Sequence, residues 1–321
     1  MTVKEAFSAT RKVVISKNPL PVEQTCALDL IELAMPDAAL STAPGDAAEK
    51  QTFKIAVLEN APFATDHITQ KATPFSDKPW AYFRISPRGG GELVVSHANL
   101  LYAYIHKIID ECATEPVAAF EQGKFYQAAF RWHRPIYDYL LTQVWRTARN
   151  FDPHAHIRDI AKAGYTHLEV NGLAQPIPFE EPIPGEFYSQ FYSYCIALDQ
   201  YVYSELNKGM YPVEYLTANL NLLKEYSQIG QKYGLSPGLL CFEPRSVPEK
   251  LLQKFPTLRG ARVDHPLRSR KPRYTLSHAH PRVQAHYAEM IGKLLHAVPE
   301  LAFMSIWSND SGAGFEYTRS L

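Results

Sequence analysis

The chain has 321 residues, of which 46% are hydrophobic and 21% charged, so it can form two domains with sizeable cores. Lys plus Arg and Asp plus Glu number 33 each, and this balance argues against a general binder of nucleic acid or membrane surfaces. No run reaches the roughly 18 apolar residues of a membrane span, and no signal peptide is recognisable, which leaves the cytoplasm as the default location. The four cysteines form no C-x-x-C pair and indicate buried thiols.

The first part of the chain has the pattern of a small α/β domain. Strands are expected at residues 12–16, 53–58, 82–86 and 92–96, and helices at 21–34 and 96–112. The last two strands flank the turn Pro87-Arg-Gly-Gly-Gly91, which is typical of a hairpin. We therefore expect a small α/β domain over residues 1–118.

The rest of the chain, residues 119–321, alternates strands with helices. Strands are predicted at 128–132, 167–172, 238–243 and 301–307, and helices at 152–163, 213–233, 247–255 and 280–297. This alternation indicates βα units around a parallel sheet. An open doubly wound sheet and a truncated (β/α)8 barrel both fit the pattern.

Polar residues follow the last two predicted strands where each strand ends. Glu243 closes the third strand, and Asn309-Asp310 with a Gly-rich turn follows the fourth. Parallel strands lie about 5 Å apart and end at one edge, so Glu243 and Asp310 are expected to lie within catalytic range. Hydrolysis of a glycoside uses two such carboxyl groups, and we predict Asp310 as the acid with Glu243 in support. The structural alternatives are that Glu243 pairs with Arg245 or caps a helix, and that Asp310 only stabilises a turn.

A set of further residues around these strand ends could bind a sugar. Arg131 and Asn171 could donate to sugar hydroxyls, and Trp307 could stack on a ring or fill the core. Cationic residues of the loop 259–273 suit an anionic sugar, although a solvated loop fits them as well. The predicted substrate-binding residues are Arg131, Asn171, Arg245, Trp307, Asn309 and Glu316.

Two His-x-His pairs, His154/His156 and His278/His280, have no acidic or cysteine partner at ligand spacing. The chain also contains no nucleophile elbow, P-loop or dinucleotide-binding fingerprint. We therefore expect no metal and no cofactor.

The segments Trp80-Ala-Tyr-Phe-Arg-Ile-Ser, Glu92-Leu-Val-Val-Ser and Ala98-Asn-Leu-Leu-Tyr-Ala-Tyr carry a family resemblance. They resemble the small α/β domain that precedes the barrel in family 20 β-N-acetylhexosaminidases and in family 67 α-glucuronidases. The resemblance implies an α/β fold with a small α+β domain, followed by a partial (β/α)8 TIM barrel of about four βα units. The first barrel strand in those families carries an arginine, and Phe130-Arg131-Trp132 would take that place.

The exit of the last strand resembles both families in position but differs in chemistry. Family 20 has an Asp-Glu pair where this chain has Asn309-Asp310, and family 67 has Asp-Ser-Glu where it has Asp310-Ser311-Gly312. The resemblance implies a glycosidase, with a carbohydrate partner, that acts on an amino-sugar or uronic-acid glycan. The missing carboxylates support the alternative, a carbohydrate-binding protein without activity or an inactive fragment of an enzyme.

Four strands do not close a barrel, because closure takes about eight. We therefore expect the gene to continue with further βα units. Exposed barrel edges in a shorter product would favour a homodimer.

Overall fold

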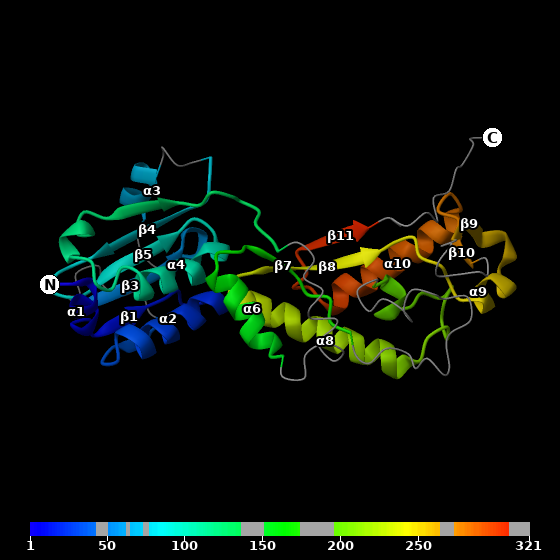
Figure 1. Ribbon diagram of the computed structural model, residues 1–321, viewed down its shortest axis with the longest axis horizontal. Helices are drawn as coiled ribbons and strands as arrows, with labels where there is room; N and C mark the ends of the chain where they lie inside the picture. Colours follow the sequence, from blue (N-terminus) through cyan, green and yellow to red (C-terminus); the bar gives the residue numbers. More distant parts are fainter. Residues whose placement is uncertain are drawn as a thin grey trace. The chain divides into compact units, whose positions relative to one another are not determined.

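The computed structural model describes residues 1–42, 51–61, 65–72, 77–135, 151–173, 196–263 and 273–307. The chain forms two compact units that combine sheet and helices (Figure 1). Unit 1 consists of Met1–Pro135, His154–Leu168 and Ile229–Ser236, and unit 2 of Ile136–Pro153, Glu169–Gln228 and Pro237–Leu321. The boundary expected between residues 118 and 119 stays a prediction.

Most predicted helices and strands are present within a few residues of their expected bounds. The α-helices are α1 Val3–Ser8, α2 Pro21–Ala34, α3 Asp66–Ala72, α4 Ala98–Asp110, α6 Pro153–Lys162, α8 Val213–Lys232, α9 Glu249–Lys254 and α10 Pro281–Ala297. The strands are β1 Lys12–Val14, β2 Ala39–Ser41, β3 Thr52–Val57, β4 Trp80–Ile85, β5 Gly91–Val95, β6 Lys124–Gln127, β7 His167–Glu169, β8 Ser236–Phe242, β9 Arg259–Val263, β10 Arg273–Leu276 and β11 Phe303–Trp307.

Unit 1 is built on a six-stranded sheet of order β2-β1-β3-β5-β4-β6 (Figure 1). Strands β1, β2, β3 and β5 run parallel, and β4 pairs antiparallel with β5, so the predicted hairpin is confirmed. Helices α2 and α4 pack against each other and against these strands. Four phenylalanine rings from α1 and the sheet region interlock in the core: Phe7, Phe53, Phe83 and Phe120.

The strand predicted at residues 128–132 is wrong. The strand in this region is β6, which ends at Gln127 and pairs antiparallel with β4 in unit 1. Phe125 explains the shift, because its ring packs 5.6 Å from Trp80 and 4.9 Å from Tyr82. Packing of Phe125 against these rings favours the pairing of residues 124–127 with β4. Arg131 therefore follows a strand instead of lying within one.

A second sheet has three strands in the order β11-β8-β7, in which β8 and β11 pair parallel. All of β11, and β8 from Pro237 on, belong to unit 2. These strands correspond to three of the four predicted barrel strands, and the partial barrel itself stays a prediction. Gly238 permits the β8–β11 contact, because a Cβ at this position would lie 2.3 Å from the ring of Phe303.

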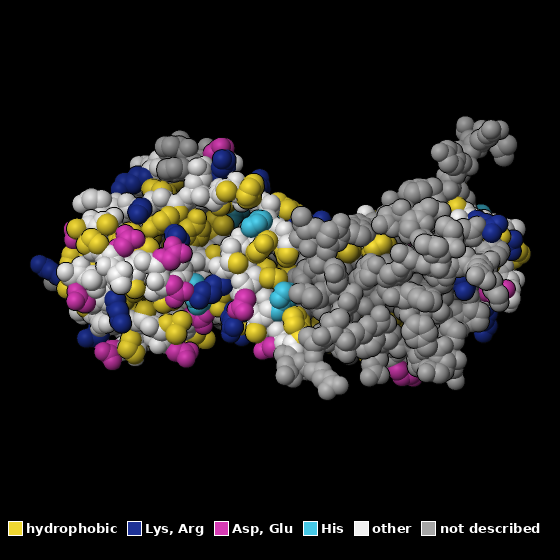
Figure 2. Space-filling view, viewed as in Figure 1, with side chains coloured by type: hydrophobic (Ala, Val, Ile, Leu, Met, Phe, Trp, Pro, Cys, Tyr) yellow, Lys and Arg dark blue, Asp and Glu magenta, His cyan; other side chains and the backbone are white. Residues whose placement is uncertain are grey.

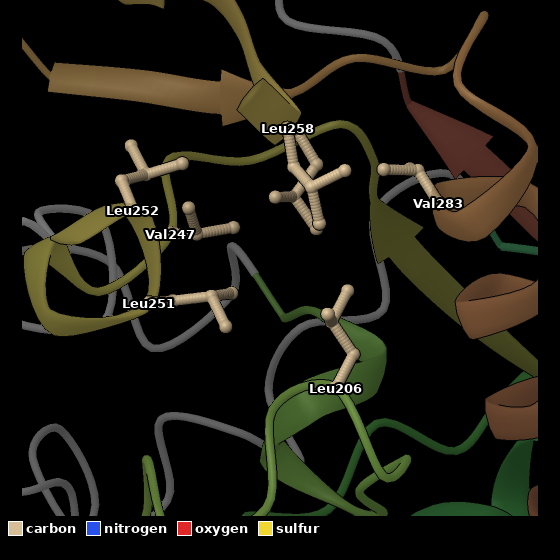
Figure 3. Packing of buried hydrophobic residues seen from close by; sticks show 7 residues of the cluster. Leu206, Val247, Leu251, Leu252, Leu258 and Val283 are labelled. Atoms are coloured by element: carbon tan, nitrogen blue, oxygen red, sulfur yellow. The ribbon is translucent and has the colours of Figure 1, made fainter. Parts of the chain in front are cut away.

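The region predicted as a basic loop after β8 contains a hairpin, which corrects that expectation. Strands β9 and β10 pair antiparallel, with Arg273 opposite Val263. A cluster of buried aliphatic side chains includes residues of α9, β10 and α10, together with residues outside these elements (Figure 3). Its members are Leu206, Val247, Leu251, Leu252, Leu258, Leu276 and Val283. The sequence did not predict these strands, because the many arginines of residues 259–273 fit a solvated loop.

None of the helices in the described ranges combines the length and apolar character that crossing a bilayer requires.

We predict that Glu23→Gln destabilises unit 1. Glu23 lies on α2, is 0% exposed, and accepts hydrogen bonds from the Leu20 N–H at 2.8 Å, the Asn60 amide at 2.9 Å and the Val57 N–H at 3.3 Å. A glutamine would turn an NH₂ group toward buried donors, which should lower the free energy of unfolding by about 1–3 kcal/mol. Urea denaturation followed by circular dichroism measures this loss. The matched change Glu32→Gln, on the exposed side of α2, should stay within about 0.5 kcal/mol, and an equal loss in both variants would contradict the prediction.

Candidate active site at the carboxyl end of β8

The parallel pair of β8 and β11 brings two chain segments to one edge of the sheet. The register places Phe242 opposite Trp307, the last residues of the two strands. The next residue after Phe242 is Glu243, and the chain after Trp307 leads to Asp310. Backbone pairing therefore aligns the two strand exits from which the predicted carboxyl groups follow.

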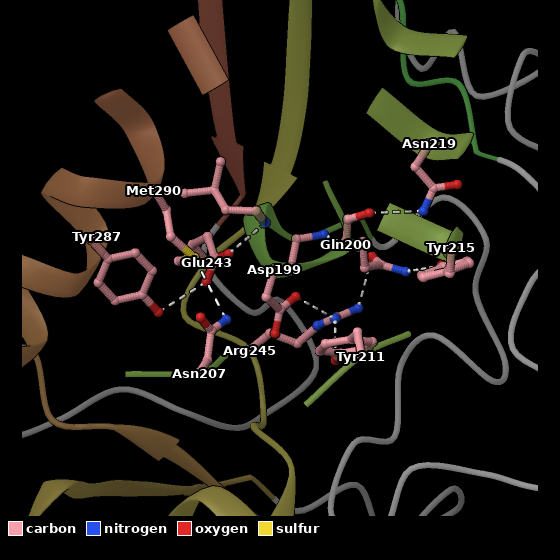
Figure 4. A network of polar contacts seen from close by, with 12 residues as sticks. Asp199, Gln200, Asn207, Tyr211, Tyr215, Asn219, Glu243, Arg245, Tyr287 and Met290 are labelled. Carbon is pink, nitrogen blue, oxygen red and sulfur yellow. Dashed lines mark hydrogen bonds and ion pairs between the residues drawn. The ribbon is translucent and has the colours of Figure 1, made fainter. Parts of the chain in front are cut away.

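The Glu243 carboxyl group is held by two donors from distant parts of unit 2. The backbone N–H of Leu198 donates to Oε1 at 3.1 Å, and the hydroxyl of Tyr287 on α10 donates to Oε2 at 3.1 Å. Figure 4 shows Tyr287 pointing from its helix toward Glu243. Since a backbone group and a helix side chain fix the two oxygens, the carboxyl group has a defined orientation at the strand end.

A buried ion pair lies beside this carboxyl group. Arg245 is 3% exposed, and its Nη2 is 3.0 Å from the Asp199 carboxylate. The same guanidinium donates to Gln200 Oε1 at 3.1 Å and to the hydroxyl of Tyr211 at 3.3 Å (Figure 4). Gln200 in turn donates to the hydroxyl of Tyr215 at 2.9 Å. This network ties residues 199–215 to the chain just after β8.

The surroundings of Glu243 favour its protonated form. Burial, and then the negative charge of Asp199, raise the pKa of Glu243 to about 7, against the lowering effect of the Leu198 N–H. Burial also raises the pKa of Asp199, while the Arg245 charge opposes that increase. The pKa of the Tyr287 phenol is raised by burial and by Glu243, so this hydroxyl remains a donor. Glu243 can thus hold a proton near neutral pH, with the negative charge of Asp199 favouring the proton and the positive charge of Arg245 opposing it.

Two predicted binding residues have structural contacts in unit 2. Arg245 holds the buried ion pair with Asp199. Asn171 is 1% exposed, and its Oδ1 accepts the Leu240 N–H of β8 at 2.8 Å. Their role in sugar binding stays a prediction, and the contacts explain why a polar residue is buried at each position.

The other predicted site residues lie elsewhere. Arg131 is an exposed residue of unit 1 and lines a cavity of about 390 Å³ with His97, Trp132 and His167. Trp307 ends β11, while Asn309, Asp310 and Glu316 lie outside the described residues. The structure thus brings Glu243 and Arg245 close together, and it leaves the roles of the others as predictions.

Sequence reasoning missed Asp199, Gln200 and Tyr287. The first two lie in the long segment rich in Pro, Tyr and Phe, which has no periodicity to place it beside a strand. Tyr287 is on the predicted helix 280–297, where an aromatic residue looks like core. The available signal was Asp199, an acidic residue that follows the apolar run Ile196-Ala-Leu198.

The described residues contain no group of three or more His, Cys, Asp or Glu side chains that could hold a metal ion. The helix α10 uses His280 as its N-cap, with Nδ1 accepting the Arg282 N–H at 3.1 Å. One His-x-His member therefore has a structural contact.

Comparison with known proteins finds similarity only among solved structures. No family model matches the sequence, and no curated protein matches it. A GH138 enzyme that targets pectin rhamnogalacturonan II superimposes with a TM-score of 0.47 at 9% identity, covering 91% of this chain and 30% of that chain. A GH20 exo-β-N-acetylglucosaminidase from Vibrio harveyi gives 0.43 at 9% identity, covering 91% and 42%. A GH89 enzyme from Clostridium perfringens, in complex with GlcNAc-α-1,4-galactose, gives 0.44 at 12% identity, covering 71% and 28%.

These neighbours are glycoside hydrolases, and the chain spans less than half the length of each. Every one of these TM-scores is under 0.5, so none of the likenesses is evidence for the activity of this chain. A proposed activity therefore has to rest on the contacts and charges of the residues of this chain.

We predict that Arg245→Gln strongly destabilises unit 2. Removing the guanidinium leaves the buried Asp199 carboxylate without its ion-pair partner, which should lower the free energy of unfolding by about 3–5 kcal/mol. Chemical denaturation measures the loss. Arg282→Gln is the matched control, because Arg282 is exposed and stacks 4.2 Å from the Phe255 ring, a contact worth about 0.5–1 kcal/mol. Similar losses in the two variants would contradict the burial argument.

We also predict a pH-dependent stability that Glu243→Gln removes. The pKa of Glu243 is raised in the folded chain from 4.5 to about 7, so the folded state binds the proton more tightly than the unfolded state. This contribution is complete below about pH 4.5 and is lost as the pH rises through 7. The stability of the Glu243→Gln variant relative to the wild type should therefore increase between pH 5 and pH 8. Parallel stability curves for the two proteins over that range would refute the assignment.

Proposed function

We propose that the chain is a glycoside hydrolase-like protein that acts on an amino-sugar or uronic-acid-containing glycan at the carboxyl end of β8 and β11. The observation that carries the proposal is the alignment of the two strand exits, with an oriented, proton-holding carboxyl group at Glu243. A pair of carboxyl groups at one sheet edge is the arrangement that glycoside hydrolysis uses.

We assign the acid role to Glu243 and the second carboxyl to Asp310. A general acid has to carry a proton at working pH, and a pKa of about 7 satisfies this requirement for Glu243. The protonated group would deliver its proton to the leaving glycosidic oxygen. Asp310, as an ionised carboxylate, would act as base or nucleophile on the other side of the sugar. Sequence alone favoured the opposite assignment, because it gave no information on the burial of Glu243.

The β9–β10 hairpin supports the uronic-acid branch of the proposal. Arg259 and Arg262 of β9 are exposed, and the hairpin packs on the same buried cluster as α10, which carries Tyr287. Guanidinium groups bind carboxylates in a bidentate manner, so an acidic sugar would be recognised on this side of unit 2. A second candidate is carbohydrate binding without cleavage, which the absent family carboxylates at Asn309 and Gly312 favour.

We expect Glu243→Gln and Asp310→Asn each to reduce the hydrolysis of a responsive aryl glycoside by at least about 100-fold, the scale of general acid–base catalysis. Release of nitrophenol from a panel of aryl amino-sugar glycosides and aryl uronides measures the rate. In the wild type the rate should fall as the pH rises past 7, because Glu243 loses its proton.

Glu249→Gln is the matched control, since Glu249 is an exposed carboxylate on α9 and should leave the rate unchanged. Full turnover by the Glu243 variant would refute the acid assignment. Glycan binding by the wild type without any product would establish the non-catalytic alternative.

A further inference from the structure

Unit 1 contains a cleft that the proposed active site does not use. Its volume is about 480 Å³, within the roughly 300–1,000 Å³ of small-molecule sites. It is lined by one side of α4, by residues 126–130 with His133, and by residues 162–164 with Thr166. Figure 2 shows hydrophobic side chains, in yellow, gathered on the visible face of unit 1.

Phe130 is the most exposed aromatic residue that lines the cleft. Its side chain is 62% exposed, which is unusual for a ring of this size. The ring lies 5.7 Å from the His133 ring, and His133 stacks on Tyr165 at 4.2 Å. The stack supports Phe130 from one side and leaves most of its surface open to a ligand.

Further aromatic residues line the cleft. The rings of Tyr104 and Tyr126 are 5.7 Å apart, and Leu100 and Ala103 of α4 add apolar surface to the lining. Ala128 and Ala129 are small residues of the same lining. A ligand in the cleft would thus meet aromatic residues from α4 and from the segment 126–130.

The charges at the cleft are compensated. Lys107 pairs with Glu111 on α4, and Lys162 pairs with Asp110 at 2.8 Å. Both lysines, Glu111 and Gln127 line the cleft. The rim therefore offers donors and acceptors without a net charge, which suits a neutral, hydroxyl-rich ligand better than an anion or a purely apolar one.

The backbone around the cleft is fixed before any ligand arrives. The His133 N–H donates to Thr166 Oγ1 at 2.8 Å, and the Thr166 N–H donates to the His133 carbonyl at 2.7 Å. The Ala128 N–H donates to the Pro79 carbonyl at 2.8 Å. A preformed site of this kind avoids the ordering cost of binding.

We propose that this cleft is a second carbohydrate site, which binds a neutral saccharide against the aromatic residues of its lining, Phe130, Tyr104 and Tyr126. The C–H faces of a sugar ring would stack on the aromatic rings, and its hydroxyls would reach the polar rim. The choice of a saccharide rests on the proposed function, whereas the site itself rests on the cleft. Such a site would hold a glycan chain on unit 1 independently of cleavage at Glu243.

Fluorine NMR of the full chain labelled with 4-fluorophenylalanine tests the site directly. The Phe130 signal is identified by its absence in Phe130→Leu, and neutral chitotriose and cellotriose are then titrated into the Glu243→Gln background, which prevents turnover. We expect the Phe130 signal to shift saturably with one of the neutral sugars. Trigalacturonate, the anionic probe, should shift it less.

Phe130→Ala should weaken binding at this site at least about tenfold, as measured by calorimetry, while circular dichroism stays unchanged because the side chain is mostly exposed. Leu33→Ala is the matched control: Leu33 is 57% exposed on α2 and lines a different cleft, so its removal should not alter binding.

A Phe130 signal that no saccharide moves would overturn the proposal, as would binding of an apolar dye in the cleft with no saccharide bound. Hydrolysis by the wild type with an unresponsive Phe130 would refute the second site alone. A saccharide-responsive Phe130 in a protein that cleaves none of the glycosides would refute the proposed hydrolysis and leave the second site standing.

Discussion

The buried ion pair between Arg245 and Asp199 is the interaction on which the proposed site depends. It joins the strand end at β8 to a segment more than 40 residues earlier in the chain, and Gln200 and Tyr211 accept further hydrogen bonds from the guanidinium. Without the cation, two buried carboxyl groups would remain beside each other. With it, Asp199 can keep its charge while Glu243 holds a proton, so one arginine separates the roles of two similar groups.

The register of β8 with β11 places Glu243 at the edge of the sheet where both strands end. Five consecutive residue pairs, from Phe303 opposite Gly238 to Trp307 opposite Phe242, end the two strands together. Gly238 allows that pairing because the ring of Phe303 occupies the space of a side chain. Polar groups can then follow both strands at one edge while the strand interiors remain apolar.

Unit 1 also contains a buried carboxylate that is stabilised by hydrogen bonds. Its sheet and the α2–α4 layer bury a carboxylate, Glu23, which is satisfied by two backbone N–H groups and one amide. The aromatic residues after β6 remain on the outside, where Phe130 lines a cleft with compensated charges. One unit thus supplies the candidate reaction site and the other a candidate binding surface, and each can be tested without the other.

The sequence by itself determined the elements whose signals are local. The 3.6-residue spacing of α4, the glycine turn between β4 and β5, and the alternation of strands with helices predicted most of the bounds and the parallel pairing of β8 with β11. It also placed Glu243 at a strand end. Only the tertiary structure decided that the strand before Arg131 is β6 of the first sheet, that β9 and β10 form a hairpin, and that Asp199 and Tyr287 surround Glu243. The reason is physical: periodicity reports which face of a segment is buried, whereas the partner of a buried polar group, and hence its pKa, depends on residues far away in the chain.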